Sequence, residues 1–237
     1  MKKFESSTRE SQARSRIYCF LAAGFSYPDA QSYQRLLGNE YFLEVDKSLK
    51  GLGASQVEPL SEPVAPSLAE LQEEYGRLFS ANSPCSPYET EYTSCHIFAK
   101  TQTLADISGF YRAFGLDTNS EQKERVDFIG TQLEFMGLLC FKMGHASDNQ
   151  NEDNFAVCLD AQKKFLGDHL GRWGELFCQR LTTQTENVYY KRLSSLLLSF
   201  LDCEKQYLDV TPEEINPLQS SKPSRSFQPE SDCSACL

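Results

Sequence analysis

Apolar residues recur at helical spacing along most of this chain, and no stretch alternates apolar and polar residues as a half-buried strand would. Such stripes predict helices over residues 6–25, 29–50, 67–79, 103–115, 123–144, two within 151–183, and 187–209. Gly38-Asn39 weakens the second range, and the two helices within 151–183 should meet near Gly167 to Gly171. The pattern therefore predicts an all-α fold, a helical bundle that forms a single domain.

Glycine, proline and capping residues mark the breaks between these helices. Residues 51–66 are rich in glycine and proline and predict a linker. Ser67 and Glu70 have the spacing of a capping box, in which each side chain bonds a backbone N–H at the helix start. Gly115 suits a helix end. The segment from Ser80 to about Phe98 predicts a loop long enough to carry function.

The helical pattern stops after residue 210. Prolines and serines fill the segment 211–237, which ends in a C-x-x-C pair formed by Cys233 and Cys236. We expect this segment to be a disordered, flexible tail or to drape over the domain. The chain thus divides into an all-helical domain over 1–210 and a tail over 211–237.

The composition adds an aromatic core and an acidic balance. The 237 residues include 16 Phe and 11 Tyr, enough for a sizeable aromatic core. A protein with a net charge of −10 is not attracted to the negative phosphate backbone, so nucleic acid is not expected as a partner. A basic peptide is a better electrostatic match, although an acidic balance also serves solubility alone.

The cysteines and the N-terminus bear on the compartment. The nine cysteines are an odd number without the spacing of a disulfide framework, which favours a reducing cytoplasm. The apolar run 17–25 follows Arg14 and Arg16, as in a signal peptide, but the run is short and Glu5 and Glu10 precede it. We interpret it as the buried face of a first helix. No other stretch approaches the length of a membrane span, so stable membrane insertion is not expected.

Four motifs stand in a fixed order in the middle of the chain. They occupy Glu74–Phe79, Ser86–Tyr92, Gly109–Leu116 and Asp127–Met136. Their order resembles the TorD/DmsD/NarJ family of cytoplasmic chaperones for molybdenum-containing redox enzymes, which carry Y-x-x-L-F, P-Y-E-S-x-Y, F-Y-x-x-x-G-L and D-H-x-x-x-x-L-E-F-M. The resemblance is close from about residue 70 to 145 and looser from the first helix to about residue 180.

The resemblance implies the same all-helical fold and a function in binding, with no cofactor of its own. Members of the family hold an apo-enzyme, or its twin-arginine signal peptide, until the cofactor is in place. This chain would then be a cytoplasmic chaperone, not an enzyme. Its partner would be the catalytic subunit precursor of a molybdopterin-dependent oxidoreductase, or the signal peptide of that precursor, before export or assembly.

The Pro87-Tyr88-Glu89 loop is the first candidate for peptide binding. Proline restrains its own backbone and that of the residue before it. Tyr88 and Tyr92 offer amphipathic rings and Glu89 a carboxylate, groups on which arginine stacks and with which it pairs. The alternative interpretation is that Tyr88 and Glu89 only pin the loop to the helices. The resemblance favours function, because the motif lies near the proposed peptide-binding surface of the family.

The second candidate comprises Asp127, Thr131 and Glu134, which the helix predicted over 123–144 would place on one face. Two acids spaced in this way could grip basic groups of a peptide. Asp127 could instead serve only as a favourable charge near a helix N-terminus. In the family a histidine linked to signal-peptide recognition follows this Asp, whereas Phe128 stands here and removes the imidazole.

Other chemistry finds less support in the sequence. The three histidines, His96, His145 and His169, have no ligand spacing, and Cys233 and Cys236 lack the second pair that a structural zinc site needs. Phosphate-binding loops, dinucleotide fingerprints and G-x-S-x-G are absent from the sequence.

Two alternatives to a leader-binding chaperone stay open. One is a helical adaptor that binds a mature client domain, and the other is a metal- or redox-active protein that works through Cys233 and Cys236. The linker at 51–66 and the joint near Gly167 are also hinges through which domain swapping could form a homo-oligomer.

Overall fold

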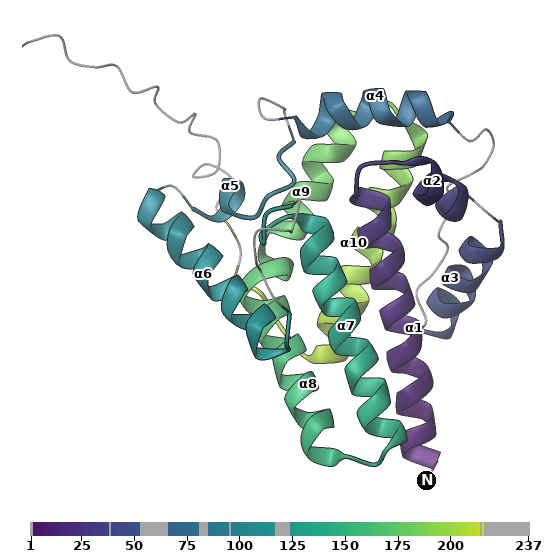
Figure 1. The fold of residues 1–237 in the computed structure, drawn as a ribbon, viewed down its shortest axis with the longest axis vertical. Coiled ribbons are helices and arrows are strands. Elements are labelled where there is room, and N and C mark those ends of the chain that lie inside the picture. The colour runs from purple at the N-terminus through teal and green to yellow at the C-terminus, as the bar shows by residue number, and fades with distance from the viewer. Residues whose placement is uncertain are drawn as a thin grey trace, which may run out of the picture.

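The computed structural model describes residues 2–37, 39–52, 66–80, 85–94, 96–116, 124–213 and 215 (Figure 1). Its helices are α1 (Lys2–Phe25), α2 (Ala30–Leu37), α3 (Asn39–Gly51), α4 (Leu68–Phe79), α5 (Thr90–Thr93), α6 (Ile97–Ala113), α7 (Ile129–Asp148), α8 (Glu152–Phe165), the π-helix η1 (Leu166–Leu170), α9 (Gly171–Gln184) and α10 (Val188–Leu208). No strand occurs within the described ranges, where one isolated antiparallel bridge joins Tyr88 and Phe128. The predicted all-α fold is confirmed.

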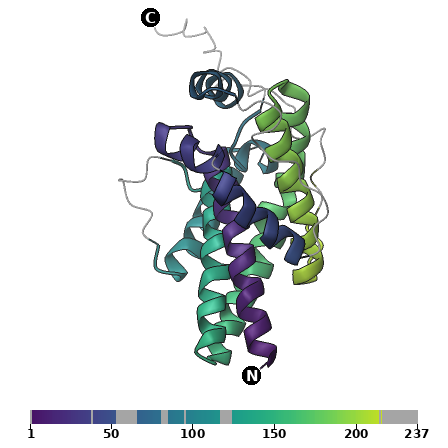
Figure 2. The same ribbon diagram turned by 90° about the vertical axis from the view of Figure 1, so that its right-hand side faces the viewer.

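The bundle is built on α1 and α7, which lie side by side in both views (Figures 1 and 2). Small residues of α7 permit this contact, because a Cβ atom on Gly137 would lie 3.2 Å from the Cys19 sulfur of α1. Helices α8, η1, α9 and α10 complete the core. Its centre is aromatic, with the rings of Phe135 and Phe165 4.8 Å apart. Trp173 and Phe177 are also fully buried, with ring centroids 5.6 Å apart.

A buried ion pair ties α1 to α10. Arg14 donates to both carboxylate oxygens of Glu204, at 2.6 Å and 2.5 Å, and the Tyr18 hydroxyl donates to the same carboxylate at 2.8 Å. Arg14 and Glu204 are almost fully shielded from solvent. Because a buried charge is costly unless it is paired, this contact fixes how the two helices align.

Helix α4 lies across one end of the bundle, above α9 and α10 in Figure 1. The predicted capping box at its start is confirmed, since Ser67 and Glu70 bond one another's backbone N–H groups. Glu74 and Arg77 anchor its second half. Arg77 donates to the Gln184 carbonyl at 2.7 Å, and the Thr185 hydroxyl donates to Glu74.

Several predicted boundaries are corrected. Helix α6 begins at Ile97 and not near residue 103, because its first turns bury no apolar stripe that periodicity could reveal. Helix α7 begins at Ile129 and not near 123, because the residues before it pair with residues 87–89 in extended geometry. The joint expected near Gly167 to Gly171 is confirmed in place, but it is the continuous π-helix η1.

Some of the sequence predictions lie outside the described residues. These are most of the linker at 51–66 and the tail from 216 onward with Cys233 and Cys236. The predicted break at Gly38-Asn39 agrees with the end of α2 at Leu37 and the start of α3 at Asn39. In the part of the chain that is described, no helix has the length and apolar character needed to cross a membrane.

Candidate functional site

Two segments far apart in the sequence meet at the start of α7. The Glu89 N–H donates to the Asp127 carbonyl at 3.0 Å, and the Ile129 N–H donates to the Pro87 carbonyl at 2.9 Å. The ring of Tyr88 lies over Phe128, with centroids 5.9 Å apart. The structure therefore brings the predicted loop residues Tyr88 and Glu89 together with Asp127.

Asp127 is buried, and both of its carboxylate oxygens accept hydrogen bonds. Its Oδ2 atom accepts from the Thr90 N–H at 3.2 Å and from the Thr90 hydroxyl at 2.8 Å, which anchors the start of α5. Arg125 adds a bidentate contact, with Nε to Oδ1 at 2.9 Å and Nη2 to Oδ2 at 2.8 Å. Because α7 begins only at Ile129, the prediction that Asp127 shares a helix face with Glu134 is wrong.

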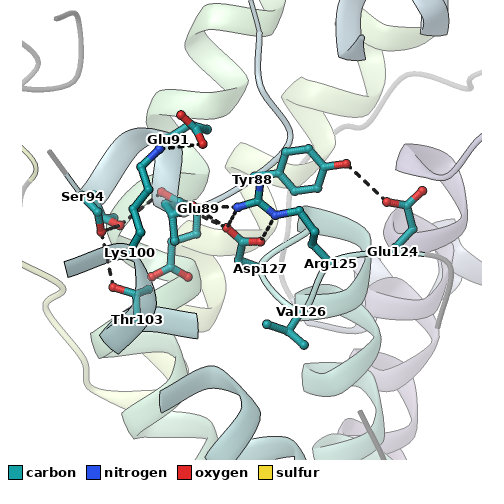
Figure 3. Close-up of polar contacts among 12 residues, drawn as sticks. Tyr88, Glu89, Glu91, Ser94, Lys100, Thr103, Glu124, Arg125, Val126 and Asp127 are labelled. Atoms are coloured by element: carbon teal, nitrogen blue, oxygen red, sulfur yellow. Dashed lines mark hydrogen bonds and ion pairs between the residues drawn. The ribbon is translucent and has the colours of Figure 1, made fainter. Parts of the chain in front are cut away.

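Arg125 lies in a cradle made by three neighbours (Figure 3). Besides Asp127, its guanidinium donates to the Thr90 hydroxyl at 2.8 Å and stacks 4.3 Å above the centre of the Tyr88 ring. Its side chain is 44% exposed, whereas that of Asp127 is 0% exposed. A carboxylate, a hydroxyl and an aromatic face around one guanidinium form an arginine-binding cradle, here filled by the chain's own Arg125. Sequence reasoning missed Arg125, although its position two residues before Asp127 was a local signal.

Glu89 is the hub of a buried polar network. Its carboxylate accepts from Gln132 Nε2 at 2.5 Å and lies 3.0 Å from His169 Nδ1 in η1. The other end of the Gln132 amide accepts from the Trp173 indole N–H at 3.0 Å. The network joins the loop to α7, η1 and α9. Sequence reasoning missed Gln132 and His169 because the partners of both stand far away in the chain.

The two tyrosines of the predicted site differ in their surroundings. Tyr92 is buried, its hydroxyl donates to the Ser86 carbonyl at 2.7 Å, and its ring lies 5.2 Å from that of Trp173. Burial raises the pKa of Tyr92. Tyr88 is only half-buried and reaches Glu124 at 3.4 Å. Partial burial and the charge of Glu124 raise its pKa.

Thr131 and Glu134 lie on α7, beyond the cradle. Thr131 is half-buried and Glu134 is exposed. Neighbouring atoms partly desolvate the Glu134 carboxyl and raise its pKa, although the side chain still reaches solvent. Of the six predicted site residues, Tyr88, Thr131 and Glu134 are therefore at least partly exposed, and Glu89, Tyr92 and Asp127 are buried.

The buried ionisable groups of the site are paired or desolvated. Its buried carboxylates are already paired, and burial raises the pKa of Cys85 to about 12, which disfavours a reactive thiolate. Among the described residues, no group of three His, Cys, Asp or Glu side chains could hold a metal ion. The side chains of the site that reach the surface include Tyr88, Thr131, Glu134 and Arg125, and the partly exposed Arg180 stacks on the Tyr92 ring at 4.6 Å.

The chain is similar to several proteins of known role. Residues 39–179 match the model of the family described as nitrate reductase delta subunit. A perchlorate reductase assembly chaperone protein of Dechloromonas aromatica (strain RCB) is 27% identical over 201 residues, covering 81% of this chain and 88% of that protein. A chlorate reductase assembly chaperone protein of Ideonella dechloratans is 27% identical, covering 85% and 93%. The chaperone protein TorD of Vibrio atlanticus (strain LGP32) is 24% identical, covering 84% and 95%.

Proposed function

Because this chain belongs to the nitrate reductase delta subunit family, we propose that it is an assembly chaperone for a molybdopterin-dependent oxidoreductase. The observation that carries the proposal is a likeness over nearly whole chains to proteins named for the assembly of perchlorate and chlorate reductases. The chaperone would act in the cytoplasm, on the catalytic subunit precursor, before its export or assembly. Its work is binding and release, and folding of the client around its cofactor ends the interaction.

The surface around Tyr88, Thr131 and Glu134 is the proposed binding site for the client's twin-arginine signal peptide. Apolar contacts supply most of the affinity, and carboxylates orient the peptide and select arginine. Glu89 and Tyr92 are buried, and hydrogen bonds to Gln132 and to the Ser86 carbonyl hold their side chains. A loop held in this way is preorganised, which lowers the entropic cost of binding.

Asp127 takes part by exchange of one arginine for another. A client guanidinium can reach Asp127 when Arg125 leaves the cradle, and the exchange conserves the bidentate pair and the stacking on Tyr88. Arg125 is suited to leave, because its side chain is 44% exposed and can be solvated outside the cradle. In its absence Asp127 keeps the two hydrogen bonds from Thr90.

Co-purification tests the proposal. The tagged chain is expressed with three forms of a reductase catalytic subunit, which are the precursor, a leader-deleted form, and a precursor with both leader arginines changed to alanine. Retention of the precursor alone supports recognition of the leader. Retention of all three forms indicates an adaptor for the mature domain. Retention of none, together with an unchanged molybdenum content of the reductase when the chain is omitted, contradicts the chaperone proposal.

A further inference from the structure

Residues 209–213 follow α10 and lie across the junction of η1 and α9, and we call them the strap. Asp209 ends α10 with a positive φ of 52°, in the left-handed region that redirects a chain at the end of a helix. Along the strap the half-buried apolar residues Val210 and Pro212 alternate with exposed polar ones. The strap therefore places its apolar side chains toward the bundle and its polar side chains toward solvent.

Two glycines of the bundle receive the strap. A Cβ atom on Gly167 of η1 would lie 3.3 Å from Val210 Cγ1. One on Gly171 of α9 would lie 2.7 Å from Pro212 Cγ and would also meet the Leu166 carbonyl. Because both side chains are absent, the strap packs directly on the backbone at the end of a π-helix, an element often found at functional sites.

The strap separates two pockets. One has a volume of about 840 Å³ and is bounded by α5, α6 and η1, and the other has a volume of about 650 Å³ and is bounded by α9 and the end of α10. Thr211 and Glu213 of the strap line both pockets, and so does Arg172 at the start of α9. Displacement of the strap would therefore join the two pockets into one groove along η1 and α9.

Arg172 connects the strap to the bundle and keeps one unsatisfied donor. Its Nη2 atom donates to Glu213 Oε2 at 3.3 Å, whereas its Nε atom is buried and has no hydrogen-bond partner among the described residues. A guanidinium N–H can only donate, so the closed strap coexists with a buried donor that lacks an acceptor. Such a donor costs free energy, which water or a carbonyl oxygen of a bound polypeptide would recover once the strap leaves Arg172.

The contacts that hold the strap against the bundle are weak. The side chain of Glu213 is 82% exposed and that of Arg172 is 29% exposed, so their ion pair contributes little. Val210 and Pro212 add apolar contact, but both are only half-buried. A segment held by so few buried contacts can open at a small cost in free energy while the helices beneath it stay folded.

We propose that the strap is a displaceable lid and that the client binds the form in which the strap has opened, a proposal that rests on the proposed function. In the closed form the strap occupies its glycine positions and Glu213 holds Arg172. In the open form the two pockets are one groove, and Arg172 donates to backbone carbonyl oxygens of the client. Because only the open fraction binds, the closed strap lowers the apparent affinity for the client.

A reversible cross-link tests the lid. Gly167→Cys combined with Val210→Cys places two thiols at a spacing that suits a disulfide, which locks the strap closed on oxidation and frees it on reduction. Mass spectrometry of the unreduced digest verifies the bond. Biolayer interferometry then measures binding of a purified molybdenum-dependent reductase precursor to the full chain. The oxidised form should bind about tenfold more weakly than the reduced form.

Wild type with and without reductant is the control for the nine native cysteines, and its affinity should not change. Equal binding by the oxidised and reduced forms of the cross-linked variant overturns the lid and leaves the proposed function standing. Absence of binding to wild type in either condition overturns the proposed function itself, and the lid with it.

A loosened strap should give the opposite change, and it decides the matter alone if the cysteine variant fails to fold. Val210→Ala combined with Pro212→Ala removes the apolar contacts of the strap, so the precursor should bind about threefold more tightly than to wild type. Val157→Ala alters a valine of α8 that is 57% exposed, and this matched control should bind with the wild-type affinity. An affinity of the loosened variant equal to or below that of wild type would overturn the lid.

Discussion

Glu89 and His169 are 80 residues apart in the sequence, and the structure places the Glu89 carboxylate 3.0 Å from the Nδ1 atom of His169. The contact joins the loop before α5 to the π-helix η1. The Nε2 atom of the same imidazole lies 3.3 Å from Asp106 Oδ2 of α6. One buried pair thus fixes the position of the loop against the core of the bundle.

Removing the Glu89 carboxylate should destabilise the fold. Glu89→Ala leaves Gln132 Nε2 and His169 Nδ1 buried without their acceptor, at a cost of about 2–4 kcal/mol in the free energy of unfolding. Urea denaturation followed by circular dichroism measures it. Glu91→Ala is the matched control, because Glu91 pairs with Lys100 at the surface, and it should cost less than about 1 kcal/mol. Equal losses of unfolding free energy in the two variants would show that the buried network stabilises the fold no more than a surface ion pair does.

The Arg14–Glu204 pair should behave as a buried ion pair. Glu204→Ala leaves the Arg14 charge uncompensated between α1 and α10, and it should lower the free energy of unfolding by about 3–5 kcal/mol. Arg14→Met combined with Glu204→Leu should recover most of this loss, because no charge stays buried. Thermal and urea unfolding of both variants give the comparison. A double variant as unstable as Glu204→Ala would indicate that packing, and not charge, determines the effect.

The contact of α4 with the end of α9 should weaken in acid. The hydrogen bond from Arg77, with a further one from Thr185, lowers the pKa of Glu74 below its ordinary value of 4.5, against the opposing effect of burial. A lowered pKa means that the stabilisation is complete above about pH 4.5 and is lost as the pH falls through the folded-state pKa. The free energy of unfolding of the wild type should exceed that of Glu74→Gln by about 1 kcal/mol at neutral pH. This difference should shrink as the pH falls below 4.5. A difference that is the same at every pH would contradict this assignment.

Vacating the cradle should strengthen arginine binding. Arg125→Gln removes the internal guanidinium from Asp127 and Tyr88, so a client arginine no longer has to displace it. We expect the affinity for a twin-arginine leader peptide to rise up to about tenfold in calorimetric titration. Arg112→Gln removes an exposed positive charge from α6 and controls for the change in net charge. An affinity for Arg125→Gln that is unchanged or reduced would mean that Asp127 does not receive client arginine.

Local signals in the sequence predicted what depends on neighbours in the chain. The capping box of Ser67 and Glu70 occurs as the residue types predicted. Gly115 ends its helix as predicted, with a positive φ of 80°. The helical stripes likewise predicted the bundle, since each is the buried face of one helix. The resemblance to a family, and not helical periodicity, singled out Tyr88, Glu89 and Asp127 as candidate site residues.

Contacts between distant segments could not be predicted in the same way. Asp127 precedes α7 because its backbone pairs with Glu89, and no pattern within residues 123–144 reveals that partner. His169 and Gln132 lie in helical segments whose sequence pattern gives them no special role. Their role comes from Glu89, a distant residue whose carboxylate contacts both side chains. Helix α6 began earlier than predicted because its first turns face outward and carry no apolar stripe.

In the proposed function, this chain recognises the arginines of a client polypeptide. Calorimetric titration with the twin-arginine leader of a molybdenum-dependent reductase precursor, against the same peptide with both arginines changed to alanine, measures this directly. We predict binding of the leader, and binding weaker by at least about tenfold for the alanine peptide. Equal binding of both peptides, or binding of neither, would contradict the claim.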